Sequence, residues 1–207
     1  MEELIHTIQS LKNSDMKTKV DKRIQEFKTI NRHSSDDLFK ELCFCILTAN
    51  FSAERGMSIH QQLSTCFVSD SEETLEKKLK QCGYRFPHIR ATYIVASAAH
   101  RHELKKIIGV LHGEELRGWL VKNIKGLGYK EASHFLRNIG YDTYAIIDSH
   151  ILDLLQRYQV IAPPKTLTKK KYLEIEKLLQ DIASQTQLTL AELDLYLWYL
   201  QTGTILK

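Results

Sequence analysis

Long apolar runs are missing from this sequence. No stretch of its 207 residues approaches the roughly twenty apolar residues that a membrane-spanning helix needs. The chain begins with Met1, Glu2 and Glu3, and such an acidic start is wrong for a signal peptide. We therefore expect a cytoplasmic protein that has no membrane partner.

Metal-ligating patterns are missing as well. The few cysteines form no C-x-x-C pair and no set with the spacing of a zinc or iron-sulfur site. They are Cys43, Cys45, Cys66 and Cys82. Reduced intracellular thiols are the simplest interpretation. His134 and His150 each lack a third ligand, so we expect surface or core histidines and no metal site.

Glycine and proline are scarce, with nine and three residues, and no region alternates with the period of a strand. The fold class predicted is all-α, with twelve helical patterns along the chain. Hydrophobic residues make up 43% of the sequence, which is enough for one compact domain or two small ones that share a cleft. Thr189 and Glu192 have the form of a capping box, and Pro163 with Pro164 predicts a bend before the last two helices.

The strongest local pattern lies between Lys122 and Ile151. Gly126 and Gly128 predict a tight turn, because glycine allows positive φ and leaves backbone N–H groups unshielded. A helical pattern resumes at once and should end at Gly140, a natural C-cap. Its apolar stripe consists of Ala132, Phe135, Leu136 and Ile139. The stretch therefore predicts a helix, a glycine hairpin and a second helix.

Bare amides at a helix start, together with the positive end of the helix dipole, form a site for an anion such as a DNA phosphate. Lys130 lies in the first turn of this helix, where the same potential favours the neutral amine that a nucleophile requires. Asp148 follows eighteen residues later and is the predicted N-cap of the next helix. One amine and one carboxylate would then face a shared cleft.

Charge is distributed unevenly along the chain, although the net charge is only +4. Between Lys77 and Lys130 there are twelve Lys or Arg and three acidic residues, a local charge of +9, so the remainder carries about −5. A basic segment beside the hairpin is the footprint expected when one face of a protein meets a polyanion. This distribution favours DNA as the partner.

These segments together resemble one family. The G-x-G-x-K hairpin followed by an aspartate is similar to that of bifunctional members of the helix-hairpin-helix DNA glycosylase superfamily. The segments KGLGYKEASHFLRNIGY and AIIDSHIL, with LTAN near residue 50 and LDLYLWYL near the end, resemble the archaeal and bacterial 8-oxoguanine DNA glycosylase/AP lyases of the second Ogg group. The similarity spans nearly the whole chain. Ser149 departs from the arginine expected in that group, which puts a phosphate contact in doubt and not the chemistry.

The resemblance implies an all-α, two-lobed helix-hairpin-helix glycosylase fold with the active site in the cleft between the lobes. Residues 34–145 would form the middle lobe, which ends in the hairpin. Residues 1–33 with 146–207 would form the second lobe. The implied partner is double-stranded DNA that contains 8-oxoguanine, bound by a monomeric protein.

The implied activity is excision of 8-oxoguanine through a Schiff base on Lys130, with Asp148 stabilising the charge on the sugar, followed by β-elimination. No redox cofactor is needed, and the family suggests a monovalent cation that bridges the hairpin to phosphate. The iron-sulfur loop of endonuclease III is excluded, because no cysteine follows Cys82. Two alternatives stay open: a noncatalytic hairpin protein that binds DNA, and a glycosylase/lyase for oxidised pyrimidines.

Two residues are candidates for insertion into the duplex. Asn50 stands at a helix exit, where its plain interpretation is a C-cap, but by resemblance it is the amide that fills the hole left by the flipped nucleotide. Phe86, held against Pro87 between Arg85 and Arg90, suits insertion between stacked bases while phosphates are held alongside. The alternative for Phe86 is a hydrophobic staple for the following helix.

The end of the chain is the candidate for base recognition. Trp198 on a leucine-rich helix is more often a core residue, yet a flipped purine needs an aromatic plate. The resemblance implies that Trp198 and Lys207 close the base pocket. Oxidation replaces the N7 acceptor of guanine with an N–H donor, so a site that offers only an acceptor, such as the terminal carboxylate of Lys207, would prefer 8-oxoguanine.

Overall fold

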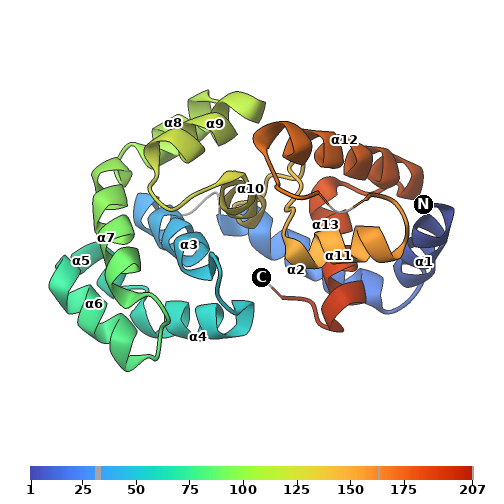
Figure 1. Cartoon of the computed structure of the whole chain (residues 1–207). Coiled ribbons are helices and arrows are strands. Elements are labelled where there is room, and N and C mark those ends of the chain that lie inside the picture. The colour runs from blue at the N-terminus through green and yellow to red at the C-terminus, as the bar shows by residue number, and fades with distance from the viewer. Residues whose placement is uncertain (31–33, 163, 207) are drawn as a thin grey trace.

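The computed structural model describes residues 1–30, 34–162 and 164–206, and these contain helices and no strand. The helices are α1 (Glu2–Lys12), α2 (Met16–Ile30), α3 (Ser35–Thr48), α4 (Ala53–Leu63), α5 (Cys66–Ser69), α6 (Glu72–Gln81), α7 (Pro87–Ser97), the 3-10 helix η1 (Ala98–His100), α8 (Leu104–Val110), α9 (Gly113–Asn123), α10 (Tyr129–Asn138), α11 (Ser149–Arg157), α12 (Lys169–Thr186) and α13 (Leu190–Thr202). Figure 1 shows them as two groups on either side of α10, with the end of the chain between the groups. None of the helices in the described ranges is long and apolar enough to cross a membrane.

Side-chain caps mark the starts of several helices. Thr189 Oγ1 accepts a hydrogen bond from the Glu192 N–H, and the Glu192 carboxylate accepts one from the Thr189 N–H, so the predicted capping box is confirmed. The same kind of serine or threonine cap is found at Ser34, Ser52, Ser71 and Thr168. Sequence patterns missed α5 and η1, because four and three residues are too short to show a helical period. The predicted bend at Pro163 lies outside the described residues.

Three clusters of buried apolar side chains form the cores of the described part of the chain. The first lies within residues 38–144. The second joins α1 to residues 145–197, and the third joins α2 to α13. The buried cores therefore divide along the chain near residue 145. This division supports the two lobes that we propose, residues 34–145 and residues 1–33 with 146–207.

Helix α10 belongs to the first core and also contacts helices of the other cores. Its Arg137 pairs with Asp194 of α13 at 2.5 Å, and its Asn138 donates a hydrogen bond to Glu41 of α3 at 2.7 Å. All four side chains are buried. Polar groups buried in this way favour one arrangement of the helices, because any other would leave them without partners. The hairpin helix is thereby fixed relative to α3 and α13.

The end of α10 lies against α2. The helix ends with Ile139 as its C-cap, and Gly140 follows with φ +95°. A Cβ at position 140 would lie 2.9 Å from the Cα of Lys28 in α2. Glycine is therefore required here both by the left-handed conformation and by the close approach of the two backbones. The predicted helix stop at Gly140 agrees with this geometry.

Candidate active site

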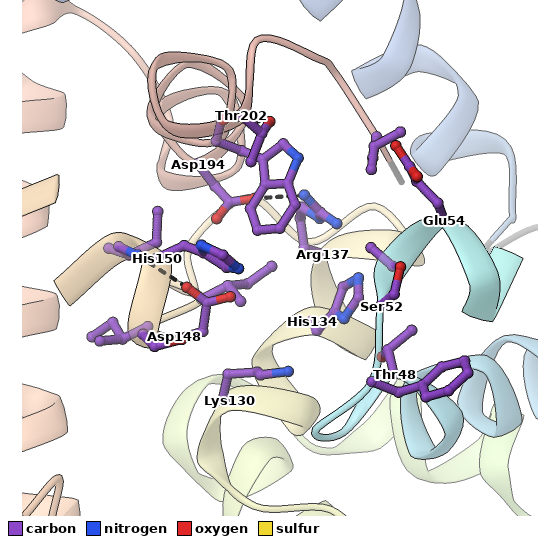
Figure 2. A pocket seen from close by; sticks show the side chains of 18 of the residues that line it. Thr48, Ser52, Glu54, Lys130, His134, Arg137, Asp148, His150, Asp194 and Thr202 are labelled. Carbon is purple, nitrogen blue, oxygen red and sulfur yellow. Dashed lines mark hydrogen bonds and ion pairs between the residues drawn. The ribbon is translucent and has the colours of Figure 1, made fainter. Parts of the chain in front are cut away.

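A cavity of about 740 Å³ lies where α10, α13, the start of α11 and the loop after α3 meet. Figure 2 shows labelled side chains from these elements around one space. The lining residues are Thr48, Asn50, Phe51, Ser52, Ala53, Glu54, Lys130, His134, Arg137, Ile146, Ile147, Asp148, Ser149, His150, Ile151, Asp194, Trp198, Thr202, Thr204 and Leu206. They come from both sides of the division between the cores, so the cavity lies between the proposed lobes.

Lys130 lies in the first turn of α10, which begins at Tyr129. His134 and Arg137 follow after four and seven residues and also line the cavity, so one stripe of the helix faces it. The Lys130 side chain is 24% exposed, and its Nζ lies 3.3 Å from Oε1 of Glu131. In Figure 2 Lys130 lies on α10 below Asp148, and both side chains border the same space. The structure thus places the predicted amine and carboxylate on one cavity.

Asp148 is the N-cap of α11, as predicted. Its Oδ1 accepts a hydrogen bond from the Ile151 N–H at 3.0 Å. The three residues before it, 145–147, are buried and lead the chain from the first core to α11. A carboxylate held by a cap bond has a fixed position at the helix start. This position is on the wall of the cavity.

A second carboxylate, Asp194 of α13, lines the same cavity and pairs with Arg137. Burial raises the pKa of Asp194 to about 6; the Arg137 guanidinium limits this rise, and the negative charge of Asp148 adds to it. Burial also lowers the pKa of Arg137, which nevertheless stays charged at neutral pH. Sequence patterns assigned Asp194 no role. The signal available was one acidic residue within the apolar run LDLYLWYL.

The glycine hairpin differs from expectation at one of its two glycines. Gly126 has φ +87°, and a Cβ there would lie 2.5 Å from Cδ2 of Tyr93. Gly128 has φ −90°, and its N–H donates to Oε2 of Glu131 at 3.2 Å. The expectation of an unshielded amide is therefore wrong for Gly128. A phosphate that binds this amide has to displace the Glu131 carboxylate, and the DNA contacts of both glycines stay predictions.

Asn50 follows α3, whose C-cap is Ala49. It has φ +57°, a left-handed conformation that asparagine tolerates better than most residues. Its side chain is exposed and it lines the cavity. The position agrees both with a helix exit and with an amide at the mouth of the cavity. Insertion into DNA stays a prediction.

Phe86 is the residue before α7 and does not line the cavity. It is 37% exposed, and the guanidinium of Arg85 lies over its ring at 4.9 Å from the centroid. An exposed aromatic ring beside a cation is available for contact with bases. Its role as a wedge stays a prediction.

The buried position of Arg90 disagrees with the predicted contact between this residue and a DNA phosphate. Only 8% of the residue is exposed, and its guanidinium donates to the carbonyl of Ala49 at 2.7 Å and to the Tyr84 hydroxyl at 3.3 Å. These bonds support the loop that carries Asn50. The prediction failed because the start of α7 at Pro87 turns position 90 toward α3, and spacing alone does not show which helix face is buried.

Trp198 of α13 lines the cavity, and its ring meets the ring of His150 edge-on with 5.2 Å between centroids. The indole N–H is buried and has no hydrogen-bond partner among the described residues. Leu206 lines the cavity as well, whereas Lys207 lies outside the described residues. The end of the chain thus reaches the cavity, and base recognition by Trp198 and Lys207 stays a prediction.

Further polar residues complete the cavity wall. His134, His150 and Ser149 all line it. No group of three or more His, Cys, Asp or Glu side chains that could hold a metal ion occurs in the described ranges. His134 borders the cavity from α10, and His150 borders it from α11.

Comparison with known proteins decides the family. The family model described as 8-oxoguanine DNA glycosylase matches residues 20–188 of this chain. The chain belongs to this family. An 8-oxoguanine DNA glycosylase/AP lyase of Methanocaldococcus jannaschii is 52% identical over 206 residues, which cover 99% of each chain. The predicted resemblance to 8-oxoguanine DNA glycosylase/AP lyases is therefore confirmed.

Two solved structures of 8-oxoguanine DNA glycosylases share the fold. The M. jannaschii glycosylase/lyase in complex with a 15mer DNA containing 8-oxoguanine is 51% identical, with a TM-score of 0.96 and coverage of 99% of this chain and 100% of that one. The Thermotoga maritima 8-oxoguanine DNA glycosylase is 39% identical, with a TM-score of 0.94 and coverage of 100% and 99%. The all-α fold class of this glycosylase family is confirmed.

Proposed function

We propose that this protein is a bifunctional 8-oxoguanine DNA glycosylase/AP lyase of base excision repair. The observation that carries the proposal is the meeting of Lys130 and Asp148 at one cavity in a chain of this family. The M. jannaschii relative is a glycosylase/AP lyase, and its solved complex contains DNA with 8-oxoguanine. The substrate is accordingly double-stranded DNA that contains 8-oxoguanine.

The size and lining of the cavity suit a nucleotide that has left the duplex. Its volume of about 740 Å³ lies within the range of roughly 300–1,000 Å³ that small-molecule pockets have. Trp198 supplies an aromatic face for the everted base, and Asn50 at the mouth can bond the base left behind. Phe86 lies outside the cavity and would wedge the neighbouring stack. These contacts offset the cost of flipping, about a few kcal/mol.

The chemistry begins at Lys130. Its neutral amine attacks C1′ of the everted nucleotide as the bond from C1′ to the base breaks, and the base leaves with the bonding electrons and takes up a proton. The Asp148 carboxylate stabilises the positive charge that develops on the sugar. The Lys130 nitrogen then forms a double bond to C1′ as the C1′–O4′ bond breaks, and O4′ takes up a proton, so the sugar ring opens to a protonated imine. This imine acidifies the C2′ proton. Loss of this proton breaks the bond to the 3′ phosphate, and hydrolysis of the imine releases the lysine.

The hairpin and the basic segment hold the DNA. The amide of Gly126, and that of Gly128 once Glu131 is displaced, donate to a backbone phosphate. A monovalent cation between the hairpin and this phosphate belongs to the proposal, whereas lysine chemistry needs no redox cofactor or iron-sulfur cluster. We place the monomeric enzyme in the cytoplasm, at the cellular DNA.

Replacing Lys130 with glutamine tests the proposal. Wild-type protein should release 8-oxoguanine from a duplex, nick the strand and become covalently attached to DNA when borohydride reduces the imine. Lys130→Gln should lose nicking and trapping and keep its affinity for lesion DNA, because the change removes only the nucleophile. Lys177→Gln, an exposed lysine of α12, is the matched control and should behave as wild type.

Two outcomes count against the proposal. A trapped adduct in Lys130→Gln would move the nucleophile to another residue. A wild-type protein that binds the duplex and leaves 8-oxoguanine in place would support a noncatalytic hairpin protein. A panel of duplexes with oxidised pyrimidines, run beside 8-oxoguanine, would show whether the substrate is a pyrimidine instead.

A further inference from the structure

A buried ion pair lies next to α10 and to the segment that leads into Asp148. Arg117 of α9 and Glu176 of α12 form a two-pronged salt bridge of 2.6 and 2.7 Å, and the two residues are 2% and 6% exposed. The rings of Tyr129, Tyr144 and Tyr172 surround the guanidinium, with 5.1, 5.2 and 5.7 Å from Cζ to their centroids. None of these five residues lines the cavity. The catalytic chemistry proposed above makes no use of them.

This cluster binds the backbone of the segment that leads into Asp148. Oε2 of Glu176 accepts a hydrogen bond from the Ala145 N–H at 2.9 Å. The Tyr172 hydroxyl donates to the Ala145 carbonyl at 2.7 Å and accepts from the Ile147 N–H at 3.2 Å. Buried backbone groups outside a helix need such partners. Two side chains of α12 therefore fix the path of the chain just before Asp148.

The same cluster holds the helix that carries Lys130. Arg117 Nη1 donates to the Ser133 hydroxyl at 3.2 Å, and the Tyr129 hydroxyl donates to Glu114 at 2.5 Å. Positions 129 and 133 are four residues apart and form a stripe of α10 beside the one that faces the cavity. One buried network thus contacts both α10, which carries Lys130, and the segment that leads into Asp148.

Burial and protonation suit the Tyr172 hydroxyl to this task. The residue is 2% exposed, and burial raises its pKa, so the hydroxyl keeps its proton and can donate it to the Ala145 carbonyl. A buried ion pair such as that of Arg117 and Glu176 is seldom a net gain in stability over apolar residues of the same volume. Apolar residues, however, cannot form the hydrogen bonds that this cluster makes to the backbone of residues 145–147.

We propose that Tyr172 and Glu176 are positioning residues, which set the place of Asp148 relative to Lys130 through the backbone of residues 145–147. The inference rests on the proposed function, because the quantity that they control is the geometry of base excision. A displacement of about 1 Å at a reacting group can cost a hundredfold in rate. Loss of the Tyr172 hydroxyl removes two hydrogen bonds to the backbone at once, those with Ala145 and Ile147.

The test compares Tyr172→Phe with Tyr141→Phe. Both changes remove one hydroxyl that donates to a backbone carbonyl, but the partner of Tyr141 is Ile108 of α8, at 3.0 Å, which does not line the cavity. The assays are the single-turnover rate of 8-oxoguanine excision, the Kd for lesion DNA, and the fraction of enzyme that borohydride traps. Tyr172→Phe should lose about ten- to hundredfold in rate per trappable enzyme, with the Kd changed less than about twofold. Tyr141→Phe should keep the wild-type rate.

If Tyr172 only stabilised the fold, Tyr172→Phe would lower the fraction of enzyme that borohydride traps, or the melting temperature. The excision rate per trappable enzyme would then equal the wild-type rate, and that result overturns the inference. If the wild-type protein is active and Tyr172→Phe excises at the same rate, the inference is wrong and the proposed function stands. If the wild-type protein is inactive, the proposed function is wrong as well. If Tyr172→Phe does not fold, Glu176→Gln takes its place. The amide has a single acceptor oxygen, which cannot serve the Ala145 N–H and both nitrogens of Arg117, so the hold on the backbone is loosened and a loss of rate in the same direction is expected.

Discussion

Replacing Asp148 with asparagine separates two roles that this side chain combines. One is mechanical, because Oδ1 caps α11 by accepting from the Ile151 N–H at 3.0 Å. The other is electrostatic, because the carboxylate lies on the cavity wall where the sugar becomes positive. Asparagine is as good an N-cap as aspartate and carries no charge. Asp148→Asn therefore removes the charge and keeps the cap.

The expected magnitudes differ between the two roles. Loss of a preorganised electrostatic group typically costs about 10² to 10³ in rate, so excision by Asp148→Asn should slow by about that factor. Its stability should fall by less than about 1 kcal/mol, the value of a charge at a helix N-terminus. Asp148→Ala loses the cap as well, at about 1 kcal/mol, which corresponds to roughly 2–4 °C in Tm for a chain of this size.

Single-turnover excision of 8-oxoguanine, with enzyme in excess over duplex, measures the chemical step without product release. Thermal melts of the same preparations measure the cap. Asp153→Asn, an exposed residue of the same helix, is the control and should match wild type in both assays. If Asp148→Asn excises at the wild-type rate, the carboxylate does not stabilise the developing charge, and the proposed mechanism is refuted.

Two further predictions concern the fold and the end of the chain. Gly140→Ala should destabilise the protein by about 2–5 kcal/mol, because φ is +95° and the new Cβ would meet the α2 backbone; Gly109→Ala, with no atom within 4 Å of the new Cβ, should not lower the melting temperature. Residues appended after Lys207 should erode the preference for 8-oxoguanine over guanine, measured as the ratio of excision rates. An unchanged melting temperature in Gly140→Ala, or an intact preference in the extended chain, would contradict these expectations.

Local patterns were sufficient for several features that depend on residues close in the chain. The capping box at Thr189, the N-cap at Asp148 and the helix end near Gly140 each involve bonds or conformations within about one helical turn. The first-turn position of Lys130 and the predicted N-cap at Asp148 indicated the pair, and the resemblance agreed with it. The bond from Gly128 to Glu131 spans only three residues, so a glutamate at the third position of the helix was a local signal for it.

The sequence by itself determined the all-α character, the glycine hairpin and the two residues on which the chemistry is proposed to depend, because each follows from short-range conformational preference or from a motif. Tertiary structure alone decided which charged residues are buried. Arg90 turns to the Ala49 carbonyl, and Arg117 meets Glu176 across 59 residues of chain. A charged residue on a helix is expected on the surface, and only the packing of the other helices shows which face of the helix they cover.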